Sequence, residues 1–177
     1  VAKLESAAYQ PGKRAMLKIK HARSADCVVA GLRLYKDRAD AVGSLLLGLH
    51  DDAGVLHHVG VTSSFSMATR QALLRELAPL RENAAEAHPW RDWHDAQVGD
   101  AQRLPGAKSR WSGDKNLAWI PLRPERVCEV RYDHLQGRRF RHATTFLRWR
   151  PDKPAADCRY DQLEVTTPYE LARVFGA

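Results

Sequence analysis

Residues 27–36 read CVVAGLRLYK, residues 42–52 read VGSLLLGLHDD and residues 54–64 read GVLHHVGVTSS. Each run is rich in valine and leucine and is bounded by turn-forming residues, a pattern typical of β-strands. The sequence DDAG at 51–54 joins the second run to the third as a tight hairpin would. The three runs therefore predict a meander of three strands.

A helix is predicted directly after this meander. Ser66 can cap it by accepting a hydrogen bond from the first turn. Apolar side chains follow Ser66 at helical spacing, namely Ala72, Leu73, Leu74, Leu77 and Leu80.

Strand-like runs return after a polar, irregular stretch over 82–116. They are LAWIPLRP (117–124), RVCEVRYDHLQ (126–136) and GRRFRHATTFLRWR (137–150), of which the last is expected to form two strand segments. The mildly acidic tail predicts a short helix from Pro168.

Three strands, a helix and at least two more strands, in that order, indicate an OB-fold, which is a five-stranded Greek-key barrel. An SH3-like barrel and a split sandwich are the alternatives, and the helix after the third strand favours the OB-fold. The expected fold class is thus mainly β with one helix. We expect this barrel over residues 26–177, while residues 1–25 hold short strands that are too few to fold alone.

Positive charge is concentrated in one part of the chain. The 28 Lys and Arg outnumber the 21 Asp and Glu by 7, and residues 103–153 alone carry 13 basic and 5 acidic residues. Ten of those 13 are arginines, whose planar guanidinium suits phosphate oxygens. The stretch therefore predicts a basic face for a polyanion, with a merely solvated face as the alternative.

Composition also sets limits on location and chemistry. No apolar run approaches the roughly 20 residues of a membrane span, and no secretory signal opens the chain. The three cysteines form no CxxC or zinc-type spacing, so we expect no metal site, and their sparse, odd number fits a reducing cytoplasm. Cys27 and Cys128 lie in apolar runs and are expected to be small core residues, not nucleophiles.

The segment MLKIKH at 16–21 places two lysines in an apolar, strand-like setting. Lys18 and Lys20 share one face of such a strand, because residues i and i+2 point the same way. Two ammonium groups in that arrangement could hold the α-phosphate of a nucleotide, and Arg14 on the preceding turn could reach the same group. The alternative is an exposed strand with solvated lysines.

These lysines belong to a longer pattern. VAK opens the chain, YQPGKRAMLKIKH stands at 9–21, RSADCVVAG at 23–31 and RFRHATTFLRWRPDK at 139–153. Together they closely resemble ATP-dependent DNA ligases, in particular the small bacterial ligases related to those of end-joining repair. The segments between them resemble the OB domain of that family, so the resemblance covers essentially the whole chain.

The resemblance implies roles at the start of the chain. VAK looks like the end of the fourth nucleotidyltransferase motif, and the KxK strand looks like the fifth. Residues 1–25 would then be the terminal strands of a nucleotidyltransferase domain. Lys18 and Lys20 would contact the AMP phosphate of ATP as catalytic residues, with Lys3 and Arg14 also on the nucleotide.

At the far end, Arg150, Asp152 and Lys153 match the sixth motif, RxDK. The resemblance implies that they close over the nucleotide during transfer of AMP to a lysine and orient the departing pyrophosphate. Magnesium or manganese would assist, held mainly by groups outside this chain. The OB domain would then swing away to clamp DNA, pivoting near the start of the domain at Asp26.

The expected partners follow from the same resemblance. They are nicked duplex DNA, a nucleotidyltransferase domain and, more distantly, a repair polymerase or DNA-end-binding protein, in a bacterial cytoplasm at the nucleoid and away from membranes. DNA contacts are expected from six basic residues, which are Arg110, Lys115, Arg138, Arg139, Arg141 and Arg148.

One departure from the family pattern is informative. The nucleophile of these ligases is the lysine of a KxDG motif, and no KxDG occurs in this sequence. We therefore expect the chain to be the carboxy-terminal part of a ligase and to be inactive alone. The alternatives are a free-standing OB module that binds nucleic acid without catalysis, and a related RNA ligase or mRNA capping enzyme.

Overall fold

The structure of the 177-residue chain is a computed structural model. Within the residues that it describes, no helix has the length and hydropathy needed to cross a membrane. The described residues are 23–36, 38–91 and 118–163, with short pieces near the start of the chain at 2–3, 6, 8, 10–13 and 16–17.

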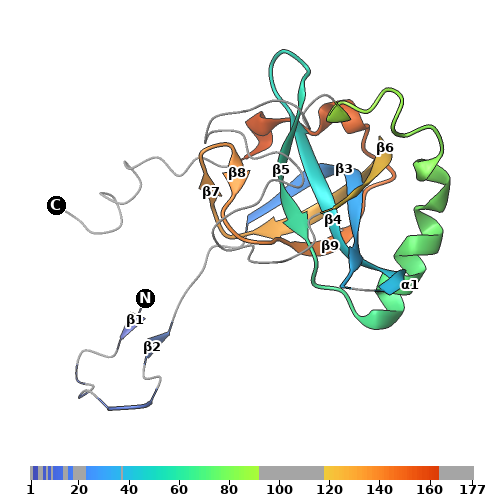
Figure 1. Cartoon of the computed structure of the whole chain (residues 1–177). Helices are drawn as coiled ribbons and strands as arrows, with labels where there is room; N and C mark the ends of the chain where they lie inside the picture. The colour runs from blue at the N-terminus through green and yellow to red at the C-terminus, as the bar shows by residue number, and fades with distance from the viewer. Residues whose placement is uncertain are drawn as a thin grey trace.

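Three consecutive antiparallel strands form one side of the barrel (Figure 1). They are β3 (Arg23–Tyr35), β4 (Arg38–His50) and β5 (Leu56–Thr62). Their inward-facing valines and leucines are fully buried, which is why these runs lack the regular polar alternation of a half-exposed strand. The predicted meander is confirmed.

Two further strands complete the sheet in the order β5-β4-β3-β6-β9. They are β6 (Ile120–Tyr132) and β9 (Thr145–Trp149). A parallel bridge between Thr62 and Thr144 joins the two edges, with Thr144 N donating to Val61 O over 2.8 Å and Thr62 Oγ1 donating to Thr144 O over 3.1 Å. Closure pairs backbone groups that an open edge would leave exposed, and it confirms the five-stranded barrel.

The two runs LAWIPLRP and RVCEVRYDHLQ form one continuous strand, where we expected two. The register with β3 jumps from Val29 opposite Arg126 to Gly31 opposite Pro121, so a bulge absorbs the residues between. Pro124 lies inside that bulge, where a missing N–H breaks no ladder hydrogen bond. Pro124 therefore lies inside one continuous strand.

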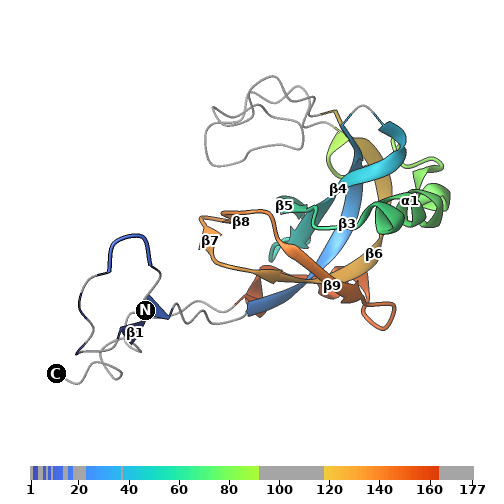
Figure 2. The same cartoon turned by 90° about the horizontal axis from the view of Figure 1, so that it is seen from below.

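The predicted helix is α1 (Met67–Glu76), and it begins as expected. Ser66 caps it, because its Oγ accepts a hydrogen bond from Thr69 N at 3.2 Å. Arg70 ties the helix to the barrel by donating to Val42 O, Gly43 O and Ser63 O at 2.6–2.7 Å. The helix thus lies against one side of the barrel (Figure 2).

The chain after α1 continues as the short 3-10 helix η1 (Ala78–Arg81) and brings Trp90 into the core, where it is 1% exposed. Trp90 Nε1 donates to Leu56 O over 2.8 Å. Its ring meets His88 and Trp119 edge-on, with centroids 5.4 and 5.9 Å away. This aromatic cluster fills one region of the barrel core.

A small hairpin lies on the side of the barrel opposite α1 in both views (Figures 1 and 2). Its strands are β7 (Leu135–Gln136) and β8 (Arg139–Phe140). Phe140 is buried and anchors the hairpin on β5, where a Cβ at Gly60 would come within 3.0 Å of the phenyl ring. The absence of a side chain at Gly60 is what allows this close approach.

All three cysteines are reduced and buried. Cys27 on β3 lies directly opposite Cys128 on β6, and burial raises the pKa of both thiols. Burial also raises the pKa of Cys158 to about 12. Such thiols stay protonated and unreactive at neutral pH, so the prediction that Cys27 and Cys128 are core residues is confirmed.

The first residues pair as β1 (Ala2–Lys3) and β2 (Met16–Leu17) in a separate antiparallel sheet, with Lys3 opposite Met16. The VAK stretch therefore lies beside the strand that leads into KIK. The tail helix expected from Pro168 lies outside the described residues. The 3-10 helices η3 (Ala155–Asp157) and η4 (Tyr160–Gln162) are the last described elements.

Candidate functional site

A tight turn after β9 carries the RxDK residues. Arg150 N donates to Val127 O at 2.9 Å, and Lys153 N donates to Arg150 O at 3.2 Å, which closes the turn. Pro151 occupies the second position, where its fixed φ favours such turns. The turn brings the side chains of Arg150 and Lys153 to the same place at the end of the strand.

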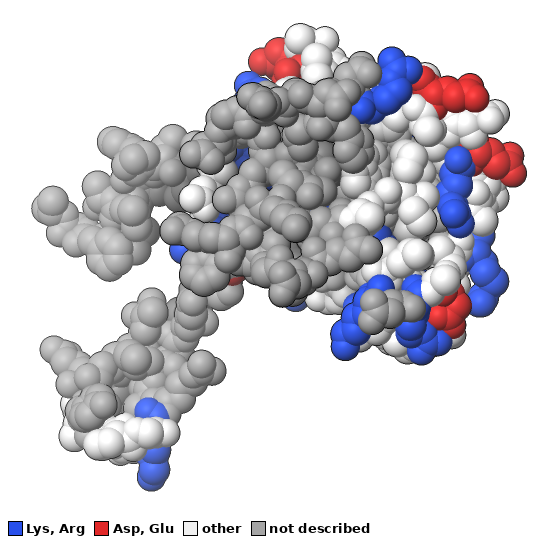
Figure 3. Space-filling model, viewed as in Figure 1, with Lys and Arg blue, Asp and Glu red and all other residues white. Residues whose placement is uncertain are grey.

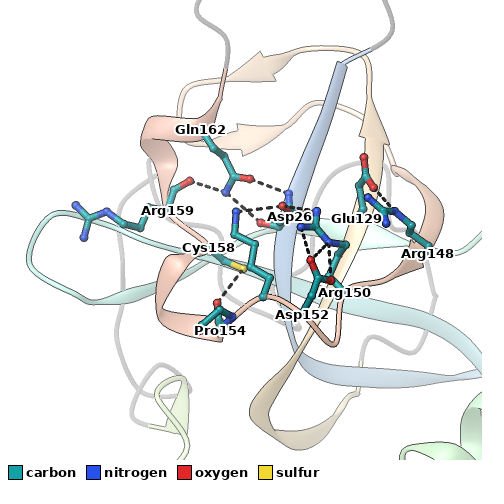
Figure 4. Close-up of polar contacts among 10 residues, drawn as sticks. Asp26, Glu129, Arg148, Arg150, Asp152, Pro154, Cys158, Arg159 and Gln162 are labelled. Atoms are coloured by element: carbon teal, nitrogen blue, oxygen red, sulfur yellow. Dashed lines mark hydrogen bonds and ion pairs between the residues drawn. The ribbon is translucent and has the colours of Figure 1, made fainter.

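Both cations point to one carboxylate, that of Asp26 on β3 (Figure 4). Arg150 Nη1 lies 3.0 Å from each carboxylate oxygen of Asp26. Lys153 Nζ lies 3.1 Å from Asp26 Oδ2, so this oxygen accepts from both cations. Arg150 and Lys153 therefore already form a site for an oxyanion.

Asp152 holds the other edge of the Arg150 guanidinium. Arg150 Nε lies 2.9 and 3.1 Å from the two Asp152 oxygens, and Nη2 lies 2.8 Å from Oδ2. The hydrogen bond from Arg150 lowers the pKa of Asp152 to about 2, and the same contact raises the pKa of Arg150. Asp152 thus orients the guanidinium within the turn, and both groups stay charged at neutral pH.

Gln162 fixes the backbone of Asp26. Its Oε1 accepts from Asp26 N at 2.7 Å, while its Nε2 donates to Asp26 O at 3.1 Å and to Arg159 O at 2.7 Å. The amide satisfies both main-chain groups of Asp26, which lies on β3 before the point where β3 begins to pair with β4. The carboxylate is therefore presented from a rigid part of the barrel.

A charged row crosses three strands next to the turn. Asp26 on β3 lies opposite Glu129 on β6, which lies opposite Arg148 on β9. Arg148 Nε donates to Glu129 at 2.7 Å, which lowers the pKa of the glutamate, and the guanidinium stays exposed. Cross-strand neighbours share a face of the sheet, so Arg148 lies on the face that carries Asp26.

The predicted basic residues of the β7–β8 hairpin flank its anchor, Phe140. Arg141 is exposed, and its Nη1 lies 3.3 Å from His134 Nε2. Arg138 is exposed beside the Tyr160 ring, with its guanidinium carbon 5.6 Å from the ring centroid. Arg139 is half-buried, with Nη2 3.1 Å from His58 Nδ1, so it packs the hairpin onto the barrel.

The basic residues predicted from composition divide into two groups. On the face seen in Figure 3, blue and red side chains are interspersed over the described surface. Several arginines of the basic stretch are neutralised, as in the ion pairs Arg123–Glu125 and Arg126–Glu76. Within the described part of the chain, three arginines of this basic stretch make no ion pair, and they are Arg131, Arg138 and Arg141.

Six other residues that are expected to contact the nucleotide or DNA have side chains outside the described part of the chain, and they are Lys3, Arg14, Lys18, Lys20, Arg110 and Lys115. Their roles remain predictions from the sequence.

The sequence predicts Asp26 only as the start of the domain, near the pivot. It predicts no role for Gln162, which holds Asp26, or for Glu129, which pairs with the neighbouring Arg148. One signal was available for Asp26, since a carboxylate directly before the fully apolar run CVVAGL must find a cation or face water.

Among the described residues, no group of three or more His, Cys, Asp or Glu side chains is arranged to hold a metal ion.

Comparison with known proteins agrees with this barrel and its terminal turn. The family model described as the ATP dependent DNA ligase C terminal region matches residues 38–153, and the match ends at Lys153 of RxDK. The chain therefore belongs to the family of ATP-dependent DNA ligase C-terminal regions. The predicted resemblance and fold class are confirmed.

Individual relatives agree. The chain is 54% identical over 166 residues to DNA ligase C2 of Mycolicibacterium smegmatis and 51% identical over 164 residues to DNA ligase C of Mycobacterium tuberculosis. Each match covers 93% of this chain but only 46% and 45% of the relative. A solved structure of mycobacterial DNA ligase D complexed with ATP and MES matches 88% of this chain and 44% of its own, with a TM-score of 0.51 and 26% identity. The chain thus spans about half the length of its curated relatives.

Proposed function

We propose that this chain is the DNA-clamping and nucleotide-closing part of an ATP-dependent DNA ligase, which seals nicks through lysyl-AMP and DNA-adenylate intermediates. Residues 1–25 would complete the nucleotidyltransferase domain, and residues 26–177 would form the OB domain. The observation that carries the proposal is the convergence of Arg150 and Lys153 on one oxyanion, in a chain of this family. The complete enzyme, not this chain alone, would be the catalyst.

The cluster fits the phosphates of ATP. Two cations that already share a carboxylate oxygen can share a phosphate oxygen, because both anions accept charge-assisted hydrogen bonds at similar distances. Bound ATP would supply the AMP group and pyrophosphate as the leaving group. Arg150 would stabilise the charge that develops on that leaving group, Lys153 would add a second contact, and Asp152 would keep the guanidinium oriented.

A divalent cation, magnesium or manganese, would neutralise phosphate charge in the same reaction. We place its ligands mainly outside this chain, on the nucleotidyltransferase domain. The barrel would then contribute only cationic side chains to the reaction. Lys18 and Lys20, which precede the barrel in the sequence, would add further contacts to the AMP phosphate.

The DNA contacts would come from the exposed hairpin and the adjacent outer face. Arg138 and Arg141 are exposed at a hairpin anchored by Phe140, and Arg131 is exposed on β6. Unpaired guanidiniums of this kind bind the phosphate backbone, which gives affinity for duplex DNA without sequence preference. We also propose Arg148, Arg110 and Lys115 as contacts, and cytoplasmic, nucleoid-associated action.

The hairpin gives a direct test. In this chain, Arg138→Ala combined with Arg141→Ala should weaken binding to nicked duplex DNA about tenfold or more at low salt, because about two phosphate contacts are lost. The slope of log affinity against log salt should become shallower by about 2. Fluorescence anisotropy across a salt series measures both quantities.

The matched control is Arg38→Ala combined with Arg123→Ala. Arg38 is exposed and Arg123 is half-buried, and both are already paired with carboxylates, those of Asp40 and Glu125. The control removes the same charge and should change the slope little. Arg139 is left intact, since its contact with His58 supports the fold. An unchanged slope in the hairpin variant would place the DNA face elsewhere on the barrel.

A free-standing OB module that binds single strands is the second candidate function. The exposed Leu147 and the stack of Arg126 on Trp149, 4.3 Å from ring centroid to guanidinium carbon, supply the kind of apolar and aromatic surface that such modules use. The RxDK turn and the paired β1 and β2 strands have no purpose in a module of that kind, which favours the ligase.

A further inference from the structure

We propose that Asp26 is an internal competitor for the phosphate site, so that a polyphosphate must displace its carboxylate before it can bind Arg150 and Lys153. This inference rests on the proposed function, because it concerns the same two cations. It assigns Asp26 the role of a latch that holds the site closed when no nucleotide is engaged.

The first argument is geometric. Asp26 Oδ2 lies 3.0 Å from Arg150 Nη1 and 3.1 Å from Lys153 Nζ, at distances that a phosphate oxygen would also adopt. The remaining Arg150 donors, Nε and Nη2, already bind Asp152. An incoming oxyanion therefore finds Arg150 Nη1 and Lys153 Nζ already bound to Asp26.

The second argument is electrostatic. The two cations of the turn face two carboxylates, those of Asp26 and Asp152, and the adjacent Arg148 is paired with Glu129. Within the described residues this cluster is neutral, so it exerts little net attraction on a polyanion. Release of Asp26 leaves an uncompensated positive charge at the point where both cations converge.

The third argument concerns which of the two carboxylates can separate from the cations. Asp152 belongs to the same four-residue turn as both cations and travels with them, whereas Asp26 belongs to β3 and is fixed there by Gln162. The side chains of Asp26, Arg150 and Lys153 are 12%, 20% and 23% exposed, so the cluster is in contact with solvent. Displacement from Asp26 therefore needs no opening of the core.

The test uses the 177-residue chain and inorganic tripolyphosphate as the probe, without divalent metal, by isothermal titration calorimetry at low salt. Asp26→Asn should bind tripolyphosphate about tenfold more tightly than the wild-type chain. Asp52→Asn is the matched control: it removes one charge from a fully exposed carboxylate paired with Arg159, and should change affinity less than twofold. Arg150→Ala added to Asp26→Asn should abolish the gain.

The outcomes separate the latch from the proposed function. If Arg150→Ala weakens binding but Asp26→Asn does not strengthen it, the phosphate role stands and the latch is wrong. If neither substitution changes the affinity, both are wrong. If Asp52→Asn increases the affinity for tripolyphosphate as much as Asp26→Asn does, the increase results from net charge alone, and the latch is wrong.

Two additions guard against a folding defect in Asp26→Asn. Asp26→Ser is a second neutral variant, and thermal unfolding checks both. The wild-type chain gives an independent readout, since tripolyphosphate should shift the NMR signal of the Arg150 Nη1 protons, which are the guanidinium protons that Asp26 accepts. A signal that stays in place at saturating tripolyphosphate contradicts the displacement.

Discussion

Arg150→Ala in the full-length protein that contains this chain should slow transfer of AMP from ATP to the protein by about a hundredfold or more. The loss of one preorganised donor to a developing oxyanion typically has an effect of this size. Sealing of a nick that already carries AMP should change only severalfold, since pyrophosphate takes no part in that step. Single-turnover assays with labelled ATP and with a pre-adenylylated nick measure the two steps separately.

Arg148→Ala is the matched control for this prediction. Arg148 lies two residues away and is an exposed arginine, but it is paired with Glu129 and does not contact Asp26 or Asp152 in the described structure. It should leave AMP transfer to the protein nearly unchanged, because that step does not involve the DNA that Arg148 is proposed to contact. Two results would contradict a contact between Arg150 and the nucleotide. One is an equal loss of rate in AMP transfer and in sealing after Arg150→Ala, and the other is an equal loss of AMP transfer in the Arg150 and Arg148 variants. Either result would indicate that Arg150 has only a structural role.

The largest expected effect on stability is that of Trp90→Ala, at about 3–5 kcal/mol in the free energy of unfolding. The Trp90 side chain is almost fully buried, and its removal leaves a cavity beside Leu56 and Gly48. Its loss also leaves the carbonyl oxygen of Leu56 without the indole donor. Thermal denaturation should show a decrease in Tm of about 10 °C for a chain of this size.

Trp149→Ala serves as the comparison, since Trp149 is only partly buried and packs against Arg126 at the surface. Its effect should be less than half that of Trp90→Ala, because an exposed cation–π contact contributes only about 0.5–1 kcal/mol. If the two tryptophans have similar effects, the segment that carries Trp90 does not complete the barrel core.

The sequence was sufficient for the features that depend on local chemistry. The apolar runs over 27–64 indicate three strands because they are short, rich in valine and leucine and bounded by turn-forming residues, and Ser66 indicates the start of the helix. The single long strand β6 was not predicted, because the bulge that accommodates Pro124 depends on the register with Val29 and Gly31 of another strand.

The candidate site likewise combines residues that the sequence identifies with one that only the folded barrel brings in. Arg150, Asp152 and Lys153 could be identified from their spacing, since a four-residue turn places them together. Asp26, 124 residues before Arg150, joins them only because β3 and β9 flank β6 in the closed barrel. Sequence spacing carries no information about such a contact.

Charge composition was similarly incomplete. It correctly indicated many arginines in one stretch, but not which of them had carboxylate partners. Arg123 and Arg126 are neutralised by Glu125 and Glu76, whereas Arg138 and Arg141 make no ion pair within the described residues. The surface open to DNA is therefore smaller than the composition suggested, and it is centred on the hairpin.

The most direct test of the account is the affinity of the 177-residue chain for a nicked duplex, compared with a single strand of the same sequence, across a salt series. A ligase barrel that grips phosphates should bind the nicked duplex more tightly, with an affinity that falls steeply as salt rises and does not depend on base sequence. Tighter binding of the single strand, with a weak salt dependence, would contradict the account and indicate a module that stacks on bases.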